Sequence, residues 1–164
     1  MRTVAVAALI GLLSSGAIAT APDSVPWLVG SWSEQVRTGA TAGPSKVLQF
    51  EMADGTLRVN EVRHDGDELV CRLDGTETRS TQMKSKATVE HILKCKVSGQ
   101  SLEIRGRSVA SGMSGIPPQQ FEIERTYEVA KDGSLRERVR IRGRILGLGT
   151  IDLADERTDY LRNR

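Results

Sequence analysis

Hydrophobic and polar residues alternate along most of the chain, in short segments separated by turn sequences. Asp-Gly occurs four times, at residues 54–55, 65–66, 74–75 and 132–133. This dipeptide between alternating segments is a strong hairpin signal, because glycine tolerates positive φ and aspartate caps the turn. Ser98–Ser101 supplies another turn, and only Val25–Val29 has the character of a helical turn. The pattern therefore predicts an all-β, antiparallel chain of consecutive hairpins.

Nine segments have the length and the β-branched composition of strands. They are Gly30–Val36, Val47–Met52, Thr56–Arg63, Glu68–Leu73, Val89–Val97, Leu102–Val109, Phe121–Val129, Leu135–Arg144 and Thr150–Tyr160. Two long polar or glycine-rich connections, Glu77–Thr88 and Ala110–Gln120, are predicted loops and candidate lids. A meander of short strands removes its edges by closing. We therefore expect an up-and-down barrel of eight or nine strands, wide enough for packed side chains or one small ligand.

The hairpin around Lys131–Gly133 has the best-determined register. A three-residue loop with a left-handed Gly133 pairs apolar residues on one face and opposite charges on the other. The expected pairs are Val129–Leu135 and Ile123–Ile141, with Glu128–Arg136, Glu124–Arg140 and Glu122–Arg142 opposite. A slip by one residue would reverse every pair. The turns at Asp54-Gly55 and Ser98–Ser101 also place apolar pairs on one face and opposite charges on the other. The hairpin at Asp65-Gly66 fits a two-residue and a three-residue loop equally.

Five arginines, at positions 136, 138, 140, 142 and 144, share one face of the predicted strand. One interpretation is a stripe that binds an anion, lipopolysaccharide or nucleic acid. The other is a solvated face opposed by glutamates, which we favour because residues 121–164 hold ten basic and nine acidic side chains. With a net charge of +2, the chain lacks the basic surface of an electrostatic nucleic-acid binder.

The N-terminus has the layout of a secretory signal. Arg2 precedes the apolar stretch Thr3–Leu13, and small residues follow to Ala21. We predict a signal peptide over residues 1–21, cleaved after Ala19 or Ala21, and one domain over residues 22–164. The predicted location is secreted or periplasmic; a retained membrane anchor is the alternative. Elsewhere no apolar run reaches the roughly 18 residues of a membrane span.

Cys71 and Cys95 are the only cysteines. After export, an even pair in a small domain predicts a disulfide. Two separate buried thiols and a catalytic thiol are the alternatives. No metal-ligand spacing is present, and neither a metal nor a cofactor is expected.

Gly30-Ser31-Trp32 resembles the G-x-W signature of the lipocalin-like (calycin) barrels. The meander and the late hairpin at Lys131–Gly133 resemble those of the small exported bacterial members. The resemblance implies that Trp32 packs across the closed end of a barrel, under an arginine from a late strand. Arg125 and Arg157 are the candidates for that arginine. It also implies an interior that holds a small ligand.

Several polar residues fall on the predicted inner face. His91 shares the apolar face of Val89–Val97, and Arg125, Tyr127 and Glu137 share the core face of the last hairpin, with Tyr127 opposite Glu137. We interpret the last three as a polar anchor for a ligand head group; a self-satisfied cluster is the alternative. His91 and Trp32 are further ligand-binding candidates. Glu61 joins them in one of the two possible registers, and His64 is expected to be exposed beside a turn.

Catalytic motifs are absent from the sequence. Gly112–Ile116 fails the G-x-S-x-G pattern at its last position, and neither a phosphate-binding loop nor a zinc-protease motif occurs. We therefore expect an exported barrel that binds a small, partly apolar molecule without catalysis, for example a fatty acid, a retinoid or haem. The alternatives are a packed-core interaction or envelope module and, less favoured, an enzyme that uses carboxylates at the barrel mouth.

Overall fold

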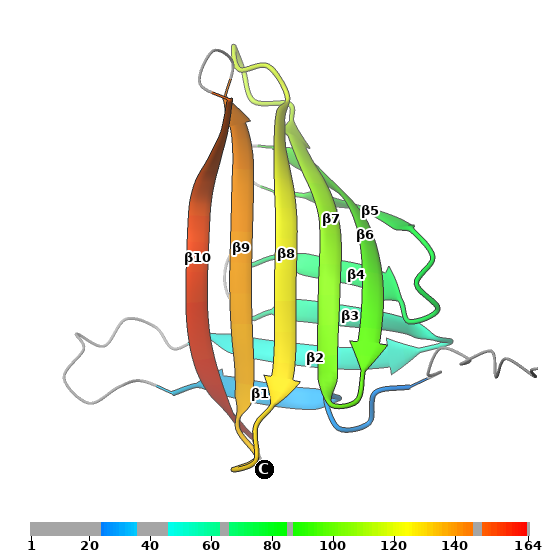
Figure 1. Cartoon of the computed structure of the whole chain (residues 1–164). Coiled ribbons are helices and arrows are strands. Elements are labelled where there is room, and N and C mark those ends of the chain that lie inside the picture. Colours follow the sequence, from blue (N-terminus) through cyan, green and yellow to red (C-terminus); the bar gives the residue numbers. More distant parts are fainter. Residues whose placement is uncertain (1–23, 36–45, 63–65, 85–86, 146–148, 164) are drawn as a thin grey trace, which may run out of the picture.

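The computed structural model describes residues 24–35, 46–62, 66–84, 87–145 and 149–163, which form a single antiparallel sheet of ten strands. The strands are β1 (Gly30–Glu34), β2 (Val47–Ala53), β3 (Thr56–Glu61), β4 (Glu68–Arg72), β5 (Thr78–Met83), β6 (Thr88–Ser98), β7 (Ser101–Ser111), β8 (Gln119–Val129), β9 (Leu135–Ile145) and β10 (Gly149–Arg162). Figure 1 shows β6–β10 standing side by side, with β1–β4 running across behind them. The predicted signal peptide, residues 1–21, and His64 lie outside the described residues.

The sheet is a meander that curls into a nearly closed barrel. Its order is β4-β3-β2-β1-β10-β9-β8-β7-β6-β5, so that the last strand pairs with the first. The all-β antiparallel prediction is confirmed, but the expected count of eight or nine strands is wrong. The additional strand, β5, lies in the segment predicted to be a loop. Its inward-facing side chains, Thr78, Ser80 and Gln82, are polar, so its alternation carries no hydrophobic signal.

The predicted hairpin registers are confirmed where the structure describes them. Phe50 pairs with Val59, Cys95 with Ile104, and Ile123 with Ile141. Gly133 has a φ of +82°, the left-handed conformation that the three-residue loop requires. The ambiguous Asp65-Gly66 hairpin includes residues outside the description. The separation of charged and apolar residues onto opposite faces was therefore sufficient to predict the strand register of these hairpins.

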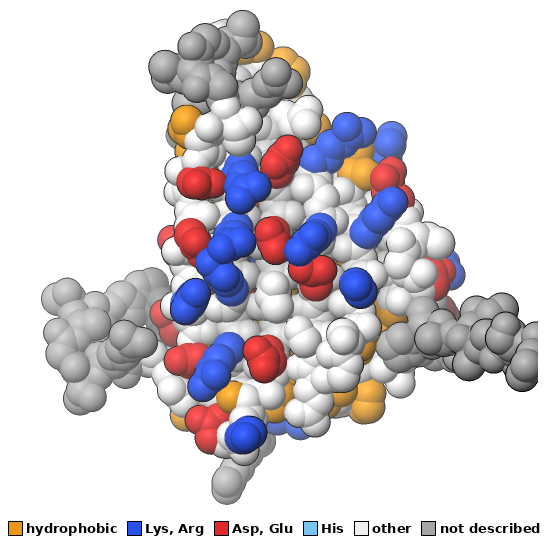
Figure 2. Space-filling view, in the orientation of Figure 1, with side chains coloured by type: hydrophobic (Ala, Val, Ile, Leu, Met, Phe, Trp, Pro, Cys, Tyr) orange, Lys and Arg blue, Asp and Glu red, His pale blue; other side chains and the backbone are white. Residues whose placement is uncertain are grey.

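The arginine face of β9 is opposed by acids on both neighbouring strands. The pairing of Glu122, Glu124 and Glu128 with Arg142, Arg140 and Arg136 is as predicted. The observed ion pairs nevertheless go to β10. Arg138 and Arg142 each lie 3.1 Å from an aspartate, Asp155 and Asp152 respectively. Figure 2 shows basic and acidic side chains interspersed on this face. Exposed pairs of this kind contribute little to stability, and they favour the solvated-face interpretation.

One end of the interior, the packed end, is filled by apolar side chains. Its members are Val25, Leu28, Trp32, Leu48, Phe50, Leu57, Val59, Leu69, Cys71, Leu73, Leu93, Cys95, Leu102, Ile104, Tyr127, Leu135 and Tyr160. Trp32 is 1 % exposed and donates a hydrogen bond from Nε1 to the carbonyl of Leu28 at 2.9 Å. This dense packing includes Phe50, Val59, Leu93 and Ile104 from four different strands.

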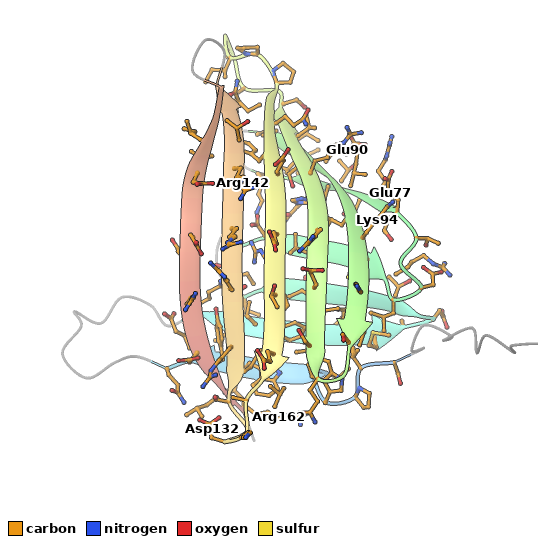
Figure 3. All side chains as sticks on the ribbon, viewed as in Figure 1. Glu77, Glu90, Lys94, Asp132, Arg142 and Arg162 are labelled. Carbon is orange, nitrogen blue, oxygen red and sulfur yellow. A yellow bond between two sulfur atoms is a disulfide. The ribbon has the colours of Figure 1, made fainter. Side chains whose placement is uncertain are left out.

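The arginine over Trp32 is Arg162. Its guanidinium carbon lies 5.5 Å from the indole centroid, and its Nη2 donates to the carbonyl of Val29 at 2.7 Å. Arg162 appears at the lower end of the molecule in Figure 3. The assignment of Arg125 or Arg157 to this position is therefore wrong. The predicted last strand stopped at Tyr160, whereas β10 continues to Arg162 and pairs it with Trp32.

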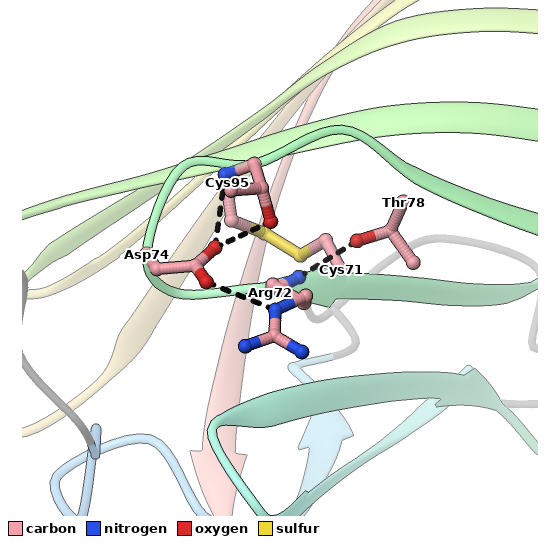
Figure 4. Close-up of a disulfide and its surroundings, with 6 residues drawn as sticks. Cys71, Arg72, Asp74, Thr78 and Cys95 are labelled. Carbon is pink, nitrogen blue, oxygen red and sulfur yellow. Dashed lines mark hydrogen bonds and ion pairs between the residues drawn. A yellow bond between two sulfur atoms is a disulfide. The ribbon is translucent and has the colours of Figure 1, made fainter.

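The barrel has a seam where β4 and β5 meet without strand pairing. The predicted disulfide between Cys71 and Cys95 is present and links β4 to β6, with a Cα–Cα distance of 5.8 Å (Figure 4). Side chains of β5 replace the missing ladder. Thr78 Oγ1 accepts a hydrogen bond from the amide of Arg72 at 3.1 Å, and Gln82 Oε1 accepts from that of Glu68 at 3.3 Å. The edge of β4 is thus partly satisfied although the sheet does not close.

Candidate functional site

A layer of polar side chains crosses the interior beside the packed end. We call it the polar layer. Each member either points inward from a strand of the barrel or lies directly before or after a strand. They are Lys46, Glu61, Asp67, Ser80, Lys84, His91, Ser108, Arg125, Tyr127, Glu137 and Tyr160.

Glu137 is the centre of one half of this layer. Its carboxylate accepts hydrogen bonds from Tyr160 Oη at 2.6 Å and Lys46 Nζ at 2.9 Å, and it lies 3.4 Å from Arg125 Nη1. Burial opposes ionisation of Glu137, but Lys46 and Arg125 hold its pKa below the usual range. Glu61 extends this half, at 3.7 Å from Lys46 Nζ. Glu137 is therefore a buried carboxylate whose negative charge is compensated.

Arg125 joins this half of the layer to the seam. Its guanidinium is 4 % exposed and its Nη2 donates to Asp67 Oδ2 at 3.0 Å. Asp67 in turn lies 3.2 Å from Lys84 Nζ, which also donates to the carbonyl of Gly66 at 2.6 Å. A continuous chain of opposite charges therefore runs from the start of β2 to the end of β5.

His91 is buried next to Ser108. Its Nδ1 lies 2.5 Å from Ser108 Oγ, and the histidine is 2 % exposed. Burial lowers the pKa of His91, and Arg125 and Lys84 lower it further against the opposing effect of Asp67. The imidazole is therefore neutral at pH 7.

The structure brings most of the predicted site residues together. Arg125 contacts Glu137 directly, Tyr127 pairs with Glu137 in the sheet, and His91 is within electrostatic range of Arg125. Trp32 does not join them, because it belongs to the packed end.

Six members of the layer were missed by the sequence analysis: Lys46, Asp67, Ser80, Lys84, Ser108 and Tyr160. Ser80 lies on β5, which was not predicted, and Ser108 lies within a predicted strand but was not considered as a site residue. Lys46 and Asp67 precede their strands, and Lys84 follows a strand that was not predicted. Tyr160 lay within a predicted strand, and continuing its alternation from Thr158 would have placed it inward.

Four buried side-chain atoms have no hydrogen-bond partner among the described residues. They are Ser80 Oγ, His91 Nε2, Arg125 Nε and Tyr127 Oη. The Tyr127 ring packs edge-on against Phe50 at 5.1 Å, so its hydroxyl extends from the packed end into the polar layer. Burial and the neighbouring Glu137 raise the pKa of Tyr127, which keeps it protonated. Because buried polar groups are normally paired, these atoms have unused capacity for a ligand or water.

Beyond the polar layer, the inward face is apolar but incompletely covered. We call this surface the inner wall: Phe121, Ile123, Ile141, Ile151 and Ala154. Ile123 is 7 % exposed, whereas the other four are half-buried. Inward-facing residues at the packed end are almost wholly shielded by comparison. In the part of the chain that the structure describes, this end of the interior, which we call the open end, is therefore less shielded than the packed end.

A concavity of about 640 Å³ lies on the outer face around Gly106. Its charged lining residues are Glu77, Lys94, Arg105, Arg107, Glu122, Glu124, Arg140 and Arg142, of which Glu77, Lys94 and Arg142 are labelled in Figure 3. Arg105 is already paired with Glu124 at 3.1 Å. Since both signs of charge alternate over this hollow, it has no preference for one ligand chemistry.

Within the described ranges, no group of three His, Cys, Asp or Glu side chains has an arrangement that could hold a metal ion. The nearest approach to a nucleophile–base pair is Ser108 with His91. Ser108 is only 3 % exposed, and the described residues show no carboxylate hydrogen-bonded to this histidine. The pair therefore lacks the third group that orients the base in acyl transfer.

No protein-family model matches the chain, and no curated protein is significantly similar to it. The fold defines it as a nearly closed antiparallel β-barrel of ten strands.

Proposed function

We propose that this protein is an exported, lipocalin-like barrel that binds a small, partly apolar molecule at its open end without chemical conversion. The observation that supports this proposal most is the position of the polar layer, whose unpartnered buried atoms lie directly beside the half-buried inner wall. Ligand sites commonly combine a mainly apolar surface with a few convergent polar groups. The signal-like N-terminus and the disulfide are in keeping with an oxidising compartment.

In this proposal, the apolar part of the ligand lies on Phe121, Ile141 and Ile151, and its polar end meets Arg125 and Tyr127. Binding then removes half-buried apolar surface from water, at about 25 cal/mol per Å². It also supplies partners to buried atoms that are otherwise unsatisfied. The two contributions require one molecule with both kinds of surface.

Binding is tested with Nile red, a neutral dye whose fluorescence increases and shifts to the blue in apolar sites. Phe121→Glu places a charge on the inner wall, and Gln120→Glu, its outward-facing neighbour on β8, is the matched control. We expect wild type and Gln120→Glu to bind the dye and Phe121→Glu to bind at least about tenfold more weakly, because an unpaired charge would be desolvated. No binding by wild type, or equal binding by both variants, would contradict the proposal.

The packed end favours a second candidate, a packed-core interaction module without a ligand. Phe50, Val59, Leu93 and Ile104 fill that part of the interior. A wild-type protein that leaves Nile red fluorescence unchanged would support this candidate. The enzyme alternative has less support, because Glu137 is buried and its negative charge is compensated by Lys46 and Arg125. These contacts keep Glu137 ionised, which disfavours a role as a proton donor.

A further inference from the structure

The geometry points to a ligand whose polar end is an uncharged hydrogen-bond acceptor, such as an ester or amide carbonyl, rather than a carboxylate or an ammonium. This inference rests on the proposed function, since it concerns the same site. It follows from two separate properties of the polar layer: its balance of charge and the kind of atoms left unpartnered.

The charges of the layer already compensate one another among the described residues. Lys46, Lys84 and Arg125 each lie within 3.7 Å of a carboxylate oxygen, and the three carboxylates are Glu61, Asp67 and Glu137. Glu34 adds a further negative charge at the edge, where its Oε2 accepts from the amide of Lys46 at 3.0 Å. A ligand carboxylate would therefore enter a buried region without an available cation, which is costly.

The unpartnered atoms favour an acceptor. Arg125 Nε–H can only donate, and the hydroxyls of Tyr127 and Ser80 each carry a donor hydrogen. His91 Nε2 donates as well in the tautomer whose Nδ1 accepts from Ser108. A carbonyl oxygen accepts from such groups and relieves the cost of leaving them buried and unpaired. An ammonium carries donors only, and it would lie beside the positive charge of Arg125. Neither charged head group therefore matches the layer.

The test compares compounds with one alkyl chain and different head groups. Decanoic acid, methyl decanoate, decanamide and decylamine are used at pH 8 to displace Nile red from the wild-type protein. We expect the ester and the amide to compete at least about tenfold more strongly than the acid and the amine, because the charged heads remain uncompensated. If the acid or the amine competes equally or better, the inference is overturned while the proposed function stands. If none of the four competes, the proposed function fails and the inference fails with it.

Charge variants give an independent check. Asp67→Asn removes a negative charge at a position where the side chain is 37 % exposed, and that charge lies opposite Arg125 Nη2 and Lys84 Nζ. Asp155→Asn, on the outward face against Arg138, is the control. We expect Asp67→Asn to improve competition by decanoic acid about tenfold, since a cation becomes available, and Asp155→Asn to leave it unchanged. If Asp67→Asn leaves the preference of the wild type intact, charge balance does not select the ligand. Circular dichroism confirms that both variants are folded.

Discussion

Removing the disulfide tests how the nearly closed barrel is held together. Cys71 and Cys95 are 24 residues apart in sequence, and a loop of that length corresponds to about 3.5 kcal/mol of stabilisation in the chain-entropy model. Both residues are almost fully buried, so alanine at the two positions also removes packing. We expect Cys71→Ala/Cys95→Ala to lose about 4–5 kcal/mol. The Cys71→Val/Cys95→Val variant restores side-chain volume and should lose about 3.5 kcal/mol, close to the cross-link alone.

Urea denaturation followed by tryptophan fluorescence measures both losses. Hydrogen exchange then locates the effect. Among the described residues, β4 and β5 have no strand pairing and are joined by side-chain hydrogen bonds, so the seam depends most on the nearby disulfide between β4 and β6. Amides of β4 and β5 should therefore exchange faster in the valine variant, relative to those of β8 and β9, than in wild type. A loss below about 1 kcal/mol in the valine variant would refute the chain-entropy argument. Uniform acceleration across all strands would refute the role assigned to the seam.

Three further predictions concern the barrel wall, its acid sensitivity and its packed end. Gly106→Ala should lower the free energy of unfolding by about 3 kcal/mol or more, because the new Cβ would overlap the backbone carbonyl of Ile92 on the neighbouring strand. In Gly143→Ala the nearest atom is the flexible end of the Leu153 side chain, so the loss in urea denaturation should be less than about 1 kcal/mol. The pKa of His91 is lower in the folded protein than in the unfolded chain, so the unfolded chain binds the proton more readily. The free energy of unfolding should therefore fall as the pH drops below the unfolded pKa of 6.5, by at most about 1.4 kcal/mol per pH unit. His91→Gln should flatten this dependence, which urea titrations at successive pH values measure. If His91→Gln has the same pH dependence of stability as wild type, His91 is not the group responsible for it. Arg162→Ala should cost about 1 kcal/mol and alter the emission of Trp32, while Arg157→Ala, remote from the indole, should do neither; equal effects would refute the stacking.

The hairpins could be predicted from sequence because both strands of each hairpin are close along the chain. Alternation placed Ile123 opposite Ile141 and Tyr127 opposite Glu137, and the sheet has both pairs. β5 was missed because its inward residues, Thr78, Ser80 and Gln82, are polar. Thr78 and Gln82 accept hydrogen bonds from β4 across the seam. A strand whose inward residues are polar shows no hydrophobic periodicity, so the pattern could not reveal it.

The candidate site was predictable only where its residues share one hairpin. Arg125, Tyr127 and Glu137 emerged together because β8 and β9 are consecutive and their register follows from local pairing. Lys46 contacts the carboxylate of Glu137, and Asp67 contacts the guanidinium of Arg125. Both residues come from distant positions in the chain and reach these groups only when the sheet curls into a barrel. No spacing rule connects them. The same limit explains Arg162, whose contact with Trp32 depends on the last strand meeting the first.

The cost of the polar layer is itself an argument about function. A buried ion pair such as Arg125–Glu137 is weak evidence for stability, because desolvation offsets most of its Coulombic attraction, and apolar residues of similar volume often serve at least as well. The packed end shows that this sequence can fill its interior with apolar side chains, and the disulfide already joins β4 to β6 there. The polar layer lies where the interior meets the half-buried inner wall. The proposed ligand site would give these charges a role that their small net contribution to stability does not.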